Sequence, residues 1–425
     1  MKKNLTLVVL AAGIGKRFWP LSANKTLFPF FGKPLFRFPG QIPGQITNIV
    51  IVSDLENADR FRETETPVAK KVVIQPEAAG MADAVLCAKN ELSGGSAIIL
   101  IADDVAQTGL LEQLVAKAAS TNASGVLIGW KTPAYFPGGY LRLAGNRVMS
   151  IEEKPGAGNE PSPFVNIFAQ YIEDADLLLA QLSRTRSAAD DVYEKALSVL
   201  MKTHEFVMLP YDGRFASLKY PWHVLDVMDV LLGELKSYKG KDVVIKDNVI
   251  LEGPVYIDDG VKIFENTKIT GPCYIGKNTI IGNNNIIRHS HIGAGCVTGF
   301  NTDIARSYIG DNCWFHGNYI GDSVLEGNVS MGSGARLANL RLDDGEIKGT
   351  GRNKLGAMIG TGVRIGVNAS IMPGLKIGKD SFIGSGVVLA QDLPDNSFCT
   401  AKPVYEITKN KKTASGSRDK FKQKI

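Results

Sequence analysis

A short glycine-rich, basic segment (GIGKR, residues 13–17) follows closely on the apolar run Leu5–Leu10. Small residues let backbone N–H groups approach a phosphate closely, and Lys16 and Arg17 add positive charge beside it. An ordinary tight turn between a strand and a helix would have the same pattern, because a lone Gly-x-Gly is common in such turns. By itself the segment leaves both a phosphate site and a structural turn open.

The elements around this segment alternate between apolar strands and helical stretches. Apolar runs at residues 5–10, 49–52, 98–101 and 125–129 alternate with helical patterns such as 82–92 and 110–119. This rhythm predicts an α/β, doubly wound (Rossmann-like) domain over residues 1–238. Ligands bind to such sheets at the carboxyl ends of the strands, which is where the glycine-rich segment stands.

The second half of the chain has a period of six. Every sixth residue is aliphatic from Leu251 to Ile287 and again from Ile359 to Leu389. Six fits neither a helix nor an alternating strand, but it fits a coil with three short faces, each placing one aliphatic residue in the core. We expect a left-handed parallel β-helix over residues 239–405, with loops where the period breaks. Rods of this build commonly trimerise, so we expect a homotrimer.

Composition excludes several classes of protein. The chain is 44% hydrophobic and 21% charged, as in ordinary globular proteins. Its net charge of +5 comes mostly from a basic tail at residues 406–425, which we expect to be disordered, so no nucleic-acid partner is expected. Five scattered cysteines indicate a reduced, cytoplasmic chain, and no apolar run is long enough to cross a membrane.

The longer strings around the glycine-rich segment resemble the signature of sugar-1-phosphate nucleotidylyltransferases. LAAGIGKRFWPLS followed by NKTLFPFFGKP is similar to that family's LAAGxGxRxxPLT and PKxLxPxxxKP. The resemblance implies that Arg17 and Lys25 hold the nucleotide's phosphates and stabilise charge at the α-phosphorus, in a reaction that needs mainly positioning and neutralisation. It also implies nucleotide contacts at Leu10, Ala11, Ala12, Gly13 and Gly15.

Further strings match the family in chain order. Gln75 and Gly80, in QPEAAG, fall where the family reads a pyrimidine base. Asp103, at the end of an apolar strand, would hold Mg²⁺, with Asp104 as an adjacent alternative, because carboxylates suit this hard cation. The resemblance implies sugar-phosphate contacts at Gly139, Glu153, Lys154 and Asn166.

Two residues depart from the family's pattern. Ser217 stands where the family usually has a second metal-binding Asp or Asn, and Lys219 replaces a usual glycine. A neutral hydroxyl is a poorer Mg²⁺ ligand than a carboxylate. Either Lys219 takes over part of the metal's charge, with Asp103 and Asp104 compensating in part, or the transferase site is weak or lost.

A second string, FHGNYIGDS at residues 315–323, resembles the H-x-x-Y-x-G-D-[AS] of glucosamine-1-phosphate acetyltransferases. These form the second half of bifunctional enzymes that make UDP-N-acetylglucosamine, and the match is closest to the archaeal type. The resemblance implies that His316 takes a proton from the amine that attacks acetyl-CoA, a task that suits imidazole. Ala305 stands where bacterial enzymes have a phosphate-binding lysine, with Arg306 adjacent, and Arg336 fills a usually small or aliphatic site. The implied substrate contacts are Arg288, Tyr319, Asn339 and Lys354.

The sequence therefore predicts an enzyme with two activities. One is nucleotidylyl transfer from an NTP, with UTP favoured, to a sugar 1-phosphate, with Mg²⁺ as cofactor and pyrophosphate released. The other is acetyl transfer from acetyl-CoA to glucosamine 1-phosphate. Two alternatives stay open: a monofunctional nucleotidylyltransferase using UTP, dTTP or GTP with a structural β-helix, and an inactive regulatory protein that binds sugar nucleotides.

Overall fold

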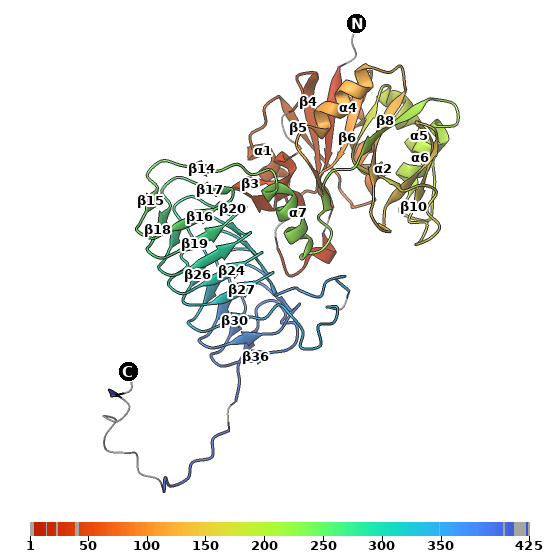
Figure 1. Cartoon of the computed structure of the whole chain (residues 1–425). Helices are drawn as coiled ribbons and strands as arrows, with labels where there is room; N and C mark the ends of the chain where they lie inside the picture. The colour runs from red at the N-terminus through yellow and green to blue at the C-terminus, as the bar shows by residue number, and fades with distance from the viewer. Residues whose placement is uncertain are drawn as a thin grey trace.

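The computed structural model describes residues 4–13, 15–22, 24–38, 42–347, 349–402, 404–411 and 422–423. A sheet covered by helices forms the first part of the molecule, and a long coil of short strands forms the second (Figure 1). Most of the basic tail, for which disorder was predicted, lies outside the described residues. None of the helices in the described part is long and apolar enough to cross a membrane.

A nine-stranded mixed sheet is the centre of the first part. Its strands are β1 (Leu5–Leu10), β4 (Ile46–Ser53), β5 (Lys70–Ile74), β6 (Ser96–Ile101), β8 (Gly125–Lys131), β9 (Gly139–Ala144), β10 (Arg147–Glu153), β11 (Phe164–Ile172) and β12 (Phe206–Tyr211), in the order β5-β4-β1-β6-β11-β8-β12-β10-β9. β5, β4, β1 and β6 are parallel, whereas β11 is antiparallel to both β6 and β8. The predicted fold class is confirmed, with an antiparallel strand in the middle of the sheet that the alternation of elements did not indicate.

Helices cover both faces of this sheet. They are α1 (Ala58–Glu63), α2 (Met81–Cys87), α3 (Lys89–Leu92), α4 (Leu110–Ala119), α5 (Ala175–Arg184) and α6 (Val192–Leu200), while α7 (His223–Leu232) packs toward the β-helix instead. Leu110, Leu111, Leu114 and Val115 give α4 a buried apolar side, which joins one core, while residues of α2, α5 and α6 join the core on the other face. The helix expected at 82–92 is divided at Ala88, where an i→i−3 hydrogen bond to Val85 tightens the turn.

Short elements frame the loops at the strand ends. They are the 3₁₀ helices η1 (Lys16–Phe18), η2 (Lys25–Leu27) and η3 (Leu35–Arg37) and the strands β2 (Pro29–Phe30), β3 (Lys33–Pro34), β7 (Asp104–Ala106) and β13 (Phe215–Ser217). β13 pairs antiparallel with β7, so that Ser217 lies opposite Asp104.

Parallel sheets wind around the second part as a β-helix. The first sheet contains β14 (Tyr238–Lys239), β17 (Val255–Ile257), β20 (Cys273–Ile275), β23 (His291–Ile292), β25 (Tyr308–Ile309), β28 (Val324–Leu325), β31 (Met358–Ile359) and β34 (Lys376–Ile377). The second side contains β15 (Val244–Ile245), β18 (Lys262–Ile263), β21 (Ile280–Ile281), β26 (Trp314–Phe315), β29 (Ser330–Met331), β32 (Arg364–Ile365), β35 (Phe382–Ile383) and β37 (Phe398–Cys399). The third sheet contains β16 (Ile250–Glu252), β19 (Lys268–Thr270), β22 (Ile286–Arg288), β24 (Asp303–Ala305), β27 (Tyr319–Gly321), β30 (Arg336–Leu337), β33 (Ser370–Ile371) and β36 (Val388–Leu389).

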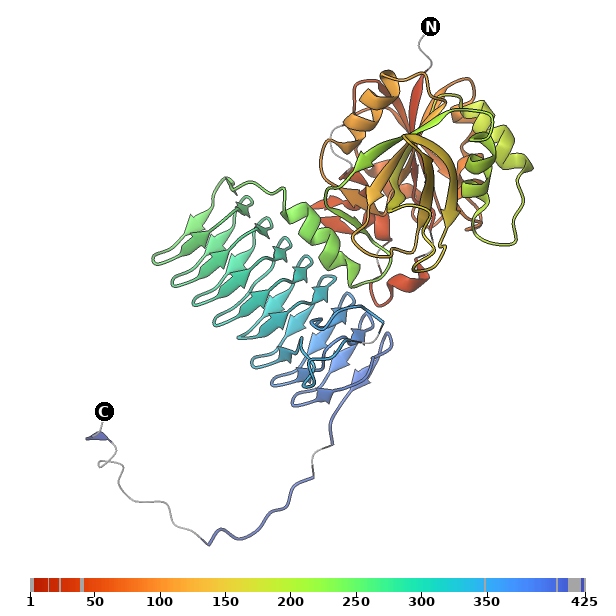
Figure 2. The same ribbon diagram turned by 45° about the vertical axis from the view of Figure 1, so that its right-hand side comes forward.

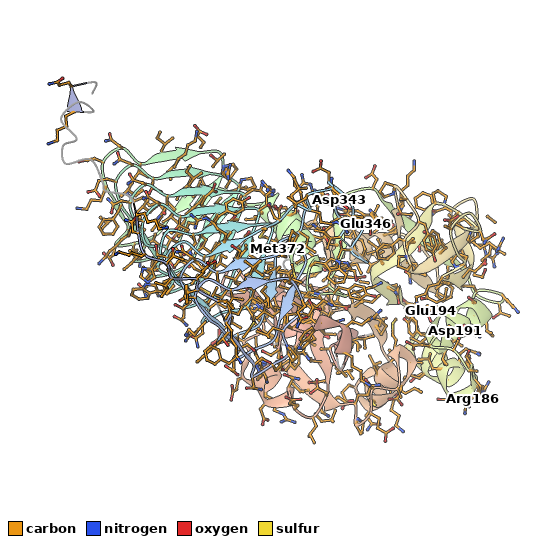
Figure 3. All side chains as sticks on the ribbon, turned by 90° about the horizontal axis from the view of Figure 1, so that it is seen from below. Arg186, Asp191, Glu194, Asp343, Glu346 and Met372 are labelled. Carbon is orange, nitrogen blue, oxygen red and sulfur yellow. The ribbon has the colours of Figure 1, made fainter. Side chains whose placement is uncertain are left out.

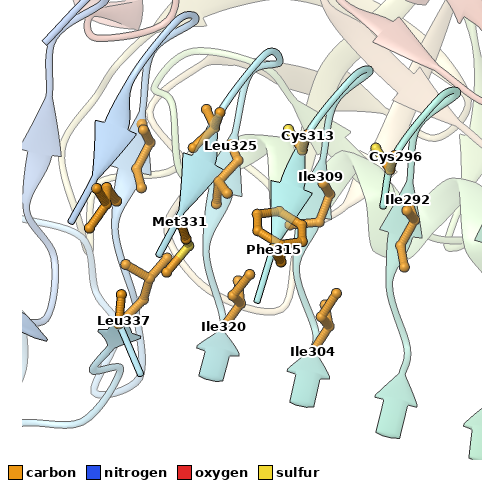
Figure 4. Packing of buried hydrophobic residues seen from close by; sticks show 14 of the residues in the cluster. Ile292, Cys296, Ile304, Ile309, Cys313, Phe315, Ile320, Leu325, Met331 and Leu337 are labelled. Atoms are coloured by element: carbon orange, nitrogen blue, oxygen red, sulfur yellow. The ribbon is translucent and has the colours of Figure 1, made fainter. Parts of the chain in front are cut away.

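One aliphatic or aromatic residue per strand fills the interior of this coil, as the period of six predicts. Figure 4 shows Ile304, Ile309, Phe315, Ile320 and Leu325 stacked inside, and all five are fully buried. Leu251, in the first turns of the coil, is an exception at 40% exposed. Where the period breaks, the coil continues with shorter turns, and a single long loop at residues 338–357 joins β30 to β31.

α7 and residues 28–31 join the two parts, and α7 lies between the sheet and the β-helix in both views (Figures 1 and 2). Phe28, Phe30 and residues of α7 share one buried cluster with Tyr308 of the β-helix. The Tyr308 hydroxyl donates a 2.6 Å hydrogen bond to the carbonyl of Pro29, and the Phe31 N–H donates a 3.1 Å bond to Nε2 of His291. The segment that follows Lys25 is therefore fixed against the β-helix.

Candidate active sites

Lys25 and Asp103 meet at the carboxyl ends of β1 and β6, which are adjacent parallel strands. Their Nζ and Oδ2 atoms are 3.5 Å apart. Lys25 begins η2, whose start is capped by Asn24, because the Asn24 side chain accepts the Thr26 N–H at 3.0 Å. Gly15, at φ +64°, lies beside the lysine, since a Cβ there would be 3.7 Å from Lys25 Cε. The glycine-rich segment, a cation and a carboxylate are thus brought to one place.

Arg17 projects from η1 and is exposed. Its guanidinium lies 5.5 Å from the centre of the Tyr220 ring, which in turn stacks on Trp222 at 4.6 Å. Arg17 makes no ion pair with any residue in the described part of the chain. Its charge is therefore available to an anionic ligand bound beside the glycine-rich segment.

Asp103 and Asp104 are the carboxylates that could hold a metal. Asp104 is half-buried, and its Oδ2 accepts the Phe168 N–H at 2.9 Å. Burial, and then the negative charge of Asp103, raise the pKa of Asp104 to about 6, while the nearby Ser217 hydroxyl and then the Lys219 ammonium act in the opposite direction. Within the described ranges no group of three or more His, Cys, Asp or Glu residues could hold a metal. Two carboxylates fit Mg²⁺, which commonly takes one or two from the protein and completes its shell with water and substrate phosphates.

Two further oxygen atoms near these carboxylates are buried without a hydrogen bond. They are Asn166 Oδ1, on β11 two residues before Phe168, and Ser217 Oγ, which faces Asp104 across the β7–β13 ladder without the geometry of a hydrogen bond. Buried polar atoms are normally paired, so these two indicate a polar ligand at this place. An all-oxygen set of this kind fits a hard cation or the hydroxyl groups of a sugar.

Gln75 and Gly80, expected at the base of the nucleotide, are in contact. The side chain of Gln75 is nearly buried, and its Nε2 donates to the Gly80 carbonyl at 3.2 Å. Gly80 has φ +88°, and a Cβ there would come within 2.7 Å of Asp190 Oδ1, so only glycine fits.

Gly139, Glu153 and Lys154, expected at the sugar phosphate, also lie together. Gly139 pairs with Glu153 between β9 and β10, and the Lys154 ammonium lies 2.7 Å from Glu153 Oε1. A Cβ on Gly139 would come within 2.8 Å of Ile151 and 3.2 Å of Glu153 Oε2. The close approach of the two strands here requires glycine.

Glu194 is a residue of this region that the sequence reasoning missed. It lies near the start of α6, close to Asp191 (Figure 3). Burial, and then the neighbouring carboxylates led by Glu153, raise the pKa of Glu194 to about 7. The only available signal was the acidic start of the helix at residues 190–194, which by itself would indicate a solvated helix end.

In the β-helix, Tyr319 and Asn339 are brought together and His316 lies at the end of β26. Tyr319 Oη donates to Asn339 Oδ1 at 3.4 Å, and Asn339 Nδ2 donates to Asp322. The exposed ring of His316 makes no hydrogen bond to these residues, although its backbone N–H donates to Asn318 Oδ1 at 2.7 Å. The centre of the network is Asp322, which is 7% exposed and was missed as a site residue. Arg306 binds it through two bonds of 2.7 and 2.8 Å.

Arg288 and Lys354 are not brought to His316 within one chain. Arg288 forms a bidentate pair with Asp303, at 2.7 and 2.9 Å. Lys354 is exposed on the 338–357 loop, where a backbone bridge pairs it with Leu340. Among the described residues no hydrogen bond or ion pair joins Arg288, Lys354 or His316 to another of the three.

A cavity of about 660 Å³ lies apart from both sites. It is enclosed by one face of the sheet, η3 and the end of α7, and Lys33, Arg37 and Glu234 are its charged residues. None of the residues predicted to bind a nucleotide or sugar lines it.

Comparisons with known proteins find matches for both the sheet-and-helix part and the β-helix part of the chain. The nucleotidyl transferase family model matches residues 6–211, and the bacterial transferase hexapeptide model of six repeats matches residues 356–391. The chain is 29% identical to the bifunctional protein GlmU of Methanococcus aeolicus, covering 93% of this chain and 97% of that protein. It is also 29% identical to the bifunctional sugar-1-phosphate nucleotidylyltransferase/acetyltransferase of Sulfurisphaera tokodaii, covering 92% and 98%.

Among solved structures, UDP-glucose pyrophosphorylase from Acinetobacter baumannii superposes with a TM-score of 0.46 at 20% identity, over 55% of this chain and 95% of that one. The chain therefore combines a nucleotidyl transferase domain with transferase hexapeptide repeats, and it is similar over almost its whole length to proteins named as bifunctional nucleotidylyltransferase/acetyltransferases.

Proposed function

We propose that residues 1–238 transfer a uridylyl group from UTP to N-acetylglucosamine 1-phosphate and that residues 239–405 acetylate glucosamine 1-phosphate. The relatives' names support the two activities. The observation that carries the proposal is the meeting of Gly15, Lys25 and Asp103 at the carboxyl ends of β1 and β6. An anionic nucleotide bound there would find backbone N–H groups, a lysine and a carboxylate in one place.

In the first reaction an oxygen of the sugar phosphate attacks the α-phosphorus of UTP, and the bond to pyrophosphate breaks. Lys25 and Arg17 neutralise the phosphate oxygens as charge develops on them. Asp103 and Asp104 would hold Mg²⁺, which supplies further neutralisation of phosphate charge when bound. Glu153 and Asn166 orient the sugar through its hydroxyl groups, and Lys154 holds its phosphate.

In the second reaction the amine of glucosamine 1-phosphate attacks the thioester carbon of acetyl-CoA. His316 accepts the proton that the amine loses, the carbon–sulfur bond breaks, and coenzyme A leaves as the thiol. Tyr319 and Asn339, held by Asp322, orient the sugar. Arg288 and Lys354 would contribute their charges to its phosphate across a contact between subunits.

A homotrimer would complete the second site. Large apolar side chains are exposed on the second side of the β-helix, at Trp314, Phe382 and Phe398, and Leu342 is fully exposed on the 338–357 loop. Exposed apolar patches of this kind mark protein contact surfaces, which supports burial against further copies of the chain. The separation of Arg288 and Lys354 from His316 within one chain supports the same arrangement.

Pyrophosphate release and thiol release test the two halves separately. The chain is mixed with UTP, N-acetylglucosamine 1-phosphate and Mg²⁺, and pyrophosphate is measured. Thiol release is then measured from acetyl-CoA with glucosamine 1-phosphate. Lys25→Ala should abolish the first signal and keep the second, while His316→Ala should do the reverse. Pyrophosphate with no thiol would favour a monofunctional enzyme, and neither signal with any sugar or NTP would favour a binding protein.

A further inference from the structure

The orientation of one side-chain amide, that of Gln75, is fixed by its neighbours. Gln75 follows β5, and its backbone N–H donates to the Ser53 carbonyl at 2.9 Å. Its side chain is 5% exposed, so both ends of the amide lie in a confined space. A role for this amide in choosing the base rests on the proposed function, since it concerns the nucleotide that this site would bind.

Both hydrogens of the Gln75 amide are used within the protein. Nε2 donates to the Gly80 carbonyl at 3.2 Å and to Asp83 Oδ2 at 2.8 Å. Asp83 lies in the first turn of α2, where a carboxylate is favoured by the helix dipole. An amide nitrogen has two hydrogens to give, and both acceptors are supplied by the same short stretch of chain.

The reverse orientation of the amide is excluded by the same two neighbours. A carbonyl and a carboxylate can only accept hydrogen bonds, so a rotated amide would direct its oxygen at two further oxygen atoms. Donors and acceptors of an amide are assigned from such networks, and this network allows one assignment. Oε1 receives no hydrogen bond from any residue that the structure describes, and it therefore remains as an unpaired acceptor.

We infer that Asp83 is a positioning residue that makes the nucleotide site select a base with an imide N–H. Uracil and thymine carry a donor at ring position 3, and guanine carries one at ring position 1, so each can donate to Oε1. Cytosine and adenine present an unprotonated ring nitrogen at that place, and two acceptors would then face each other. A site built around one hydrogen bond rejects an analogue that cannot form it by about 100-fold or more in kcat/KM.

The test compares UTP with CTP in the intact chain, with N-acetylglucosamine 1-phosphate and Mg²⁺ present. The wild type should favour UTP over CTP by about 100-fold or more. Asp83→Leu removes one of the two acceptors, so the amide can rotate and offer Nε2 to cytosine. The UTP-to-CTP ratio of kcat/KM should then fall about tenfold. Asp83→Glu, which keeps a carboxylate that can only accept, should retain most of the ratio.

Asp59→Leu is the matched control, because Asp59 is also an acidic residue in the first turn of a short helix but lies on the surface. It should leave the ratio unchanged. A wild type that uses CTP as well as UTP would overturn the inference. So would an Asp83→Leu variant that loses activity equally with both nucleotides, since a purely structural residue would act in that way. GTP or dTTP turnover alongside UTP agrees with the inference and would widen the substrate range.

Failure of the proposed function can be distinguished from failure of this inference. If no nucleotide yields pyrophosphate, binding of UTP and CTP to the wild type is measured by calorimetry without sugar phosphate. Binding of UTP with CTP at least tenfold weaker would sustain the role of Asp83 in a protein that only binds nucleotides. Equal binding of both, or binding of neither, would contradict it.

Discussion

Protonation of His291 is expected to weaken the joint between residues 28–31 and the β-helix. The ring is buried between Tyr274 and Tyr308, with ring centres 5.0 and 4.5 Å away. Nδ1 donates to the Ile309 carbonyl at 3.0 Å, and Nε2 accepts the Phe31 N–H at 3.1 Å. The neutral ring satisfies both bonds. A second proton, on Nε2, would oppose the Phe31 N–H, so the joint requires the neutral form.

The magnitude follows from the difference between the folded and unfolded pKa. Burial lowers the pKa of His291 to about 4 in the folded chain, against about 6.5 when it is unfolded. Between these values the unfolded chain binds the proton and the folded chain does not, so the free energy of unfolding falls as the pH falls. By pH 4.5 the loss from this one residue amounts to about 2.5 kcal/mol.

Urea unfolding at pH 7 and pH 4.5, followed by tryptophan fluorescence, measures this loss. Trp19 reports on the wider contact between the two parts of the molecule, because its Nε1 donates to Asp395 Oδ1 at 2.9 Å. Trp222 does so as well, because Lys376 lies 5.3 Å from its ring centre. His291→Phe keeps an aromatic ring in the stack but cannot titrate. The wild type should lose about 2.5 kcal/mol more than this variant between the two pH values. Equal losses in the two proteins would mean that protonation of His291 does not weaken this contact.

Three further predictions concern single residues. Ser217→Asp places a carboxylate opposite Asp104 and should lower the Mg²⁺ concentration needed for half-maximal pyrophosphate release about threefold or more, whereas Ser217→Ala should not. An unchanged Mg²⁺ requirement in Ser217→Asp would count against Asp104 as a ligand. Asp322→Ala leaves Arg306 and Asn339 without their acceptor, so it should lower the rate of thiol release about tenfold or more and leave the rate of pyrophosphate release unchanged. A parallel fall in both rates would mean a general loss of structure. Ile320→Ala opens a cavity in the β-helix and should lower the free energy of unfolding, measured by urea titration, by about 2–5 kcal/mol. Ile250→Ala, at an exposed position, should lower it by less than about 1 kcal/mol. Similar losses in both variants would contradict the burial of Ile320 inside the coil.

The elements that a short repeat specifies could be predicted from the sequence. Ile263, Ile269 and Ile371 are buried because a period of six allows only one side of each strand to face the interior. The glycine-rich segment and Asp103 could be expected at the same edge of the sheet, because each follows the carboxyl end of a parallel strand, whereas Lys25 reaches that edge from η2. Their assignment to a phosphate and a metal nevertheless came from family resemblance, since neither spacing nor composition identifies a ligand.

Partners supplied by tertiary packing could not be predicted in this way. Phe28 and Phe30 stand in the signature string, yet they pack against Tyr308 of the β-helix, which is far away in the sequence. Asp322 and Glu194 became visible only when burial and hydrogen bonding were known, because an acidic residue in a sequence is most often solvated. Arg288 was expected at a phosphate but is paired with Asp303, which comes beside it only through the stacking of coils.

We propose that one chain performs both transfers. The most direct measurement supplies acetyl-CoA, glucosamine 1-phosphate, UTP and Mg²⁺ together and follows thiol, pyrophosphate and sugar nucleotide in the same sample. We expect UDP-N-acetylglucosamine, with one thiol and one pyrophosphate released for each molecule formed. Pyrophosphate without thiol, thiol without pyrophosphate, or neither product would contradict it.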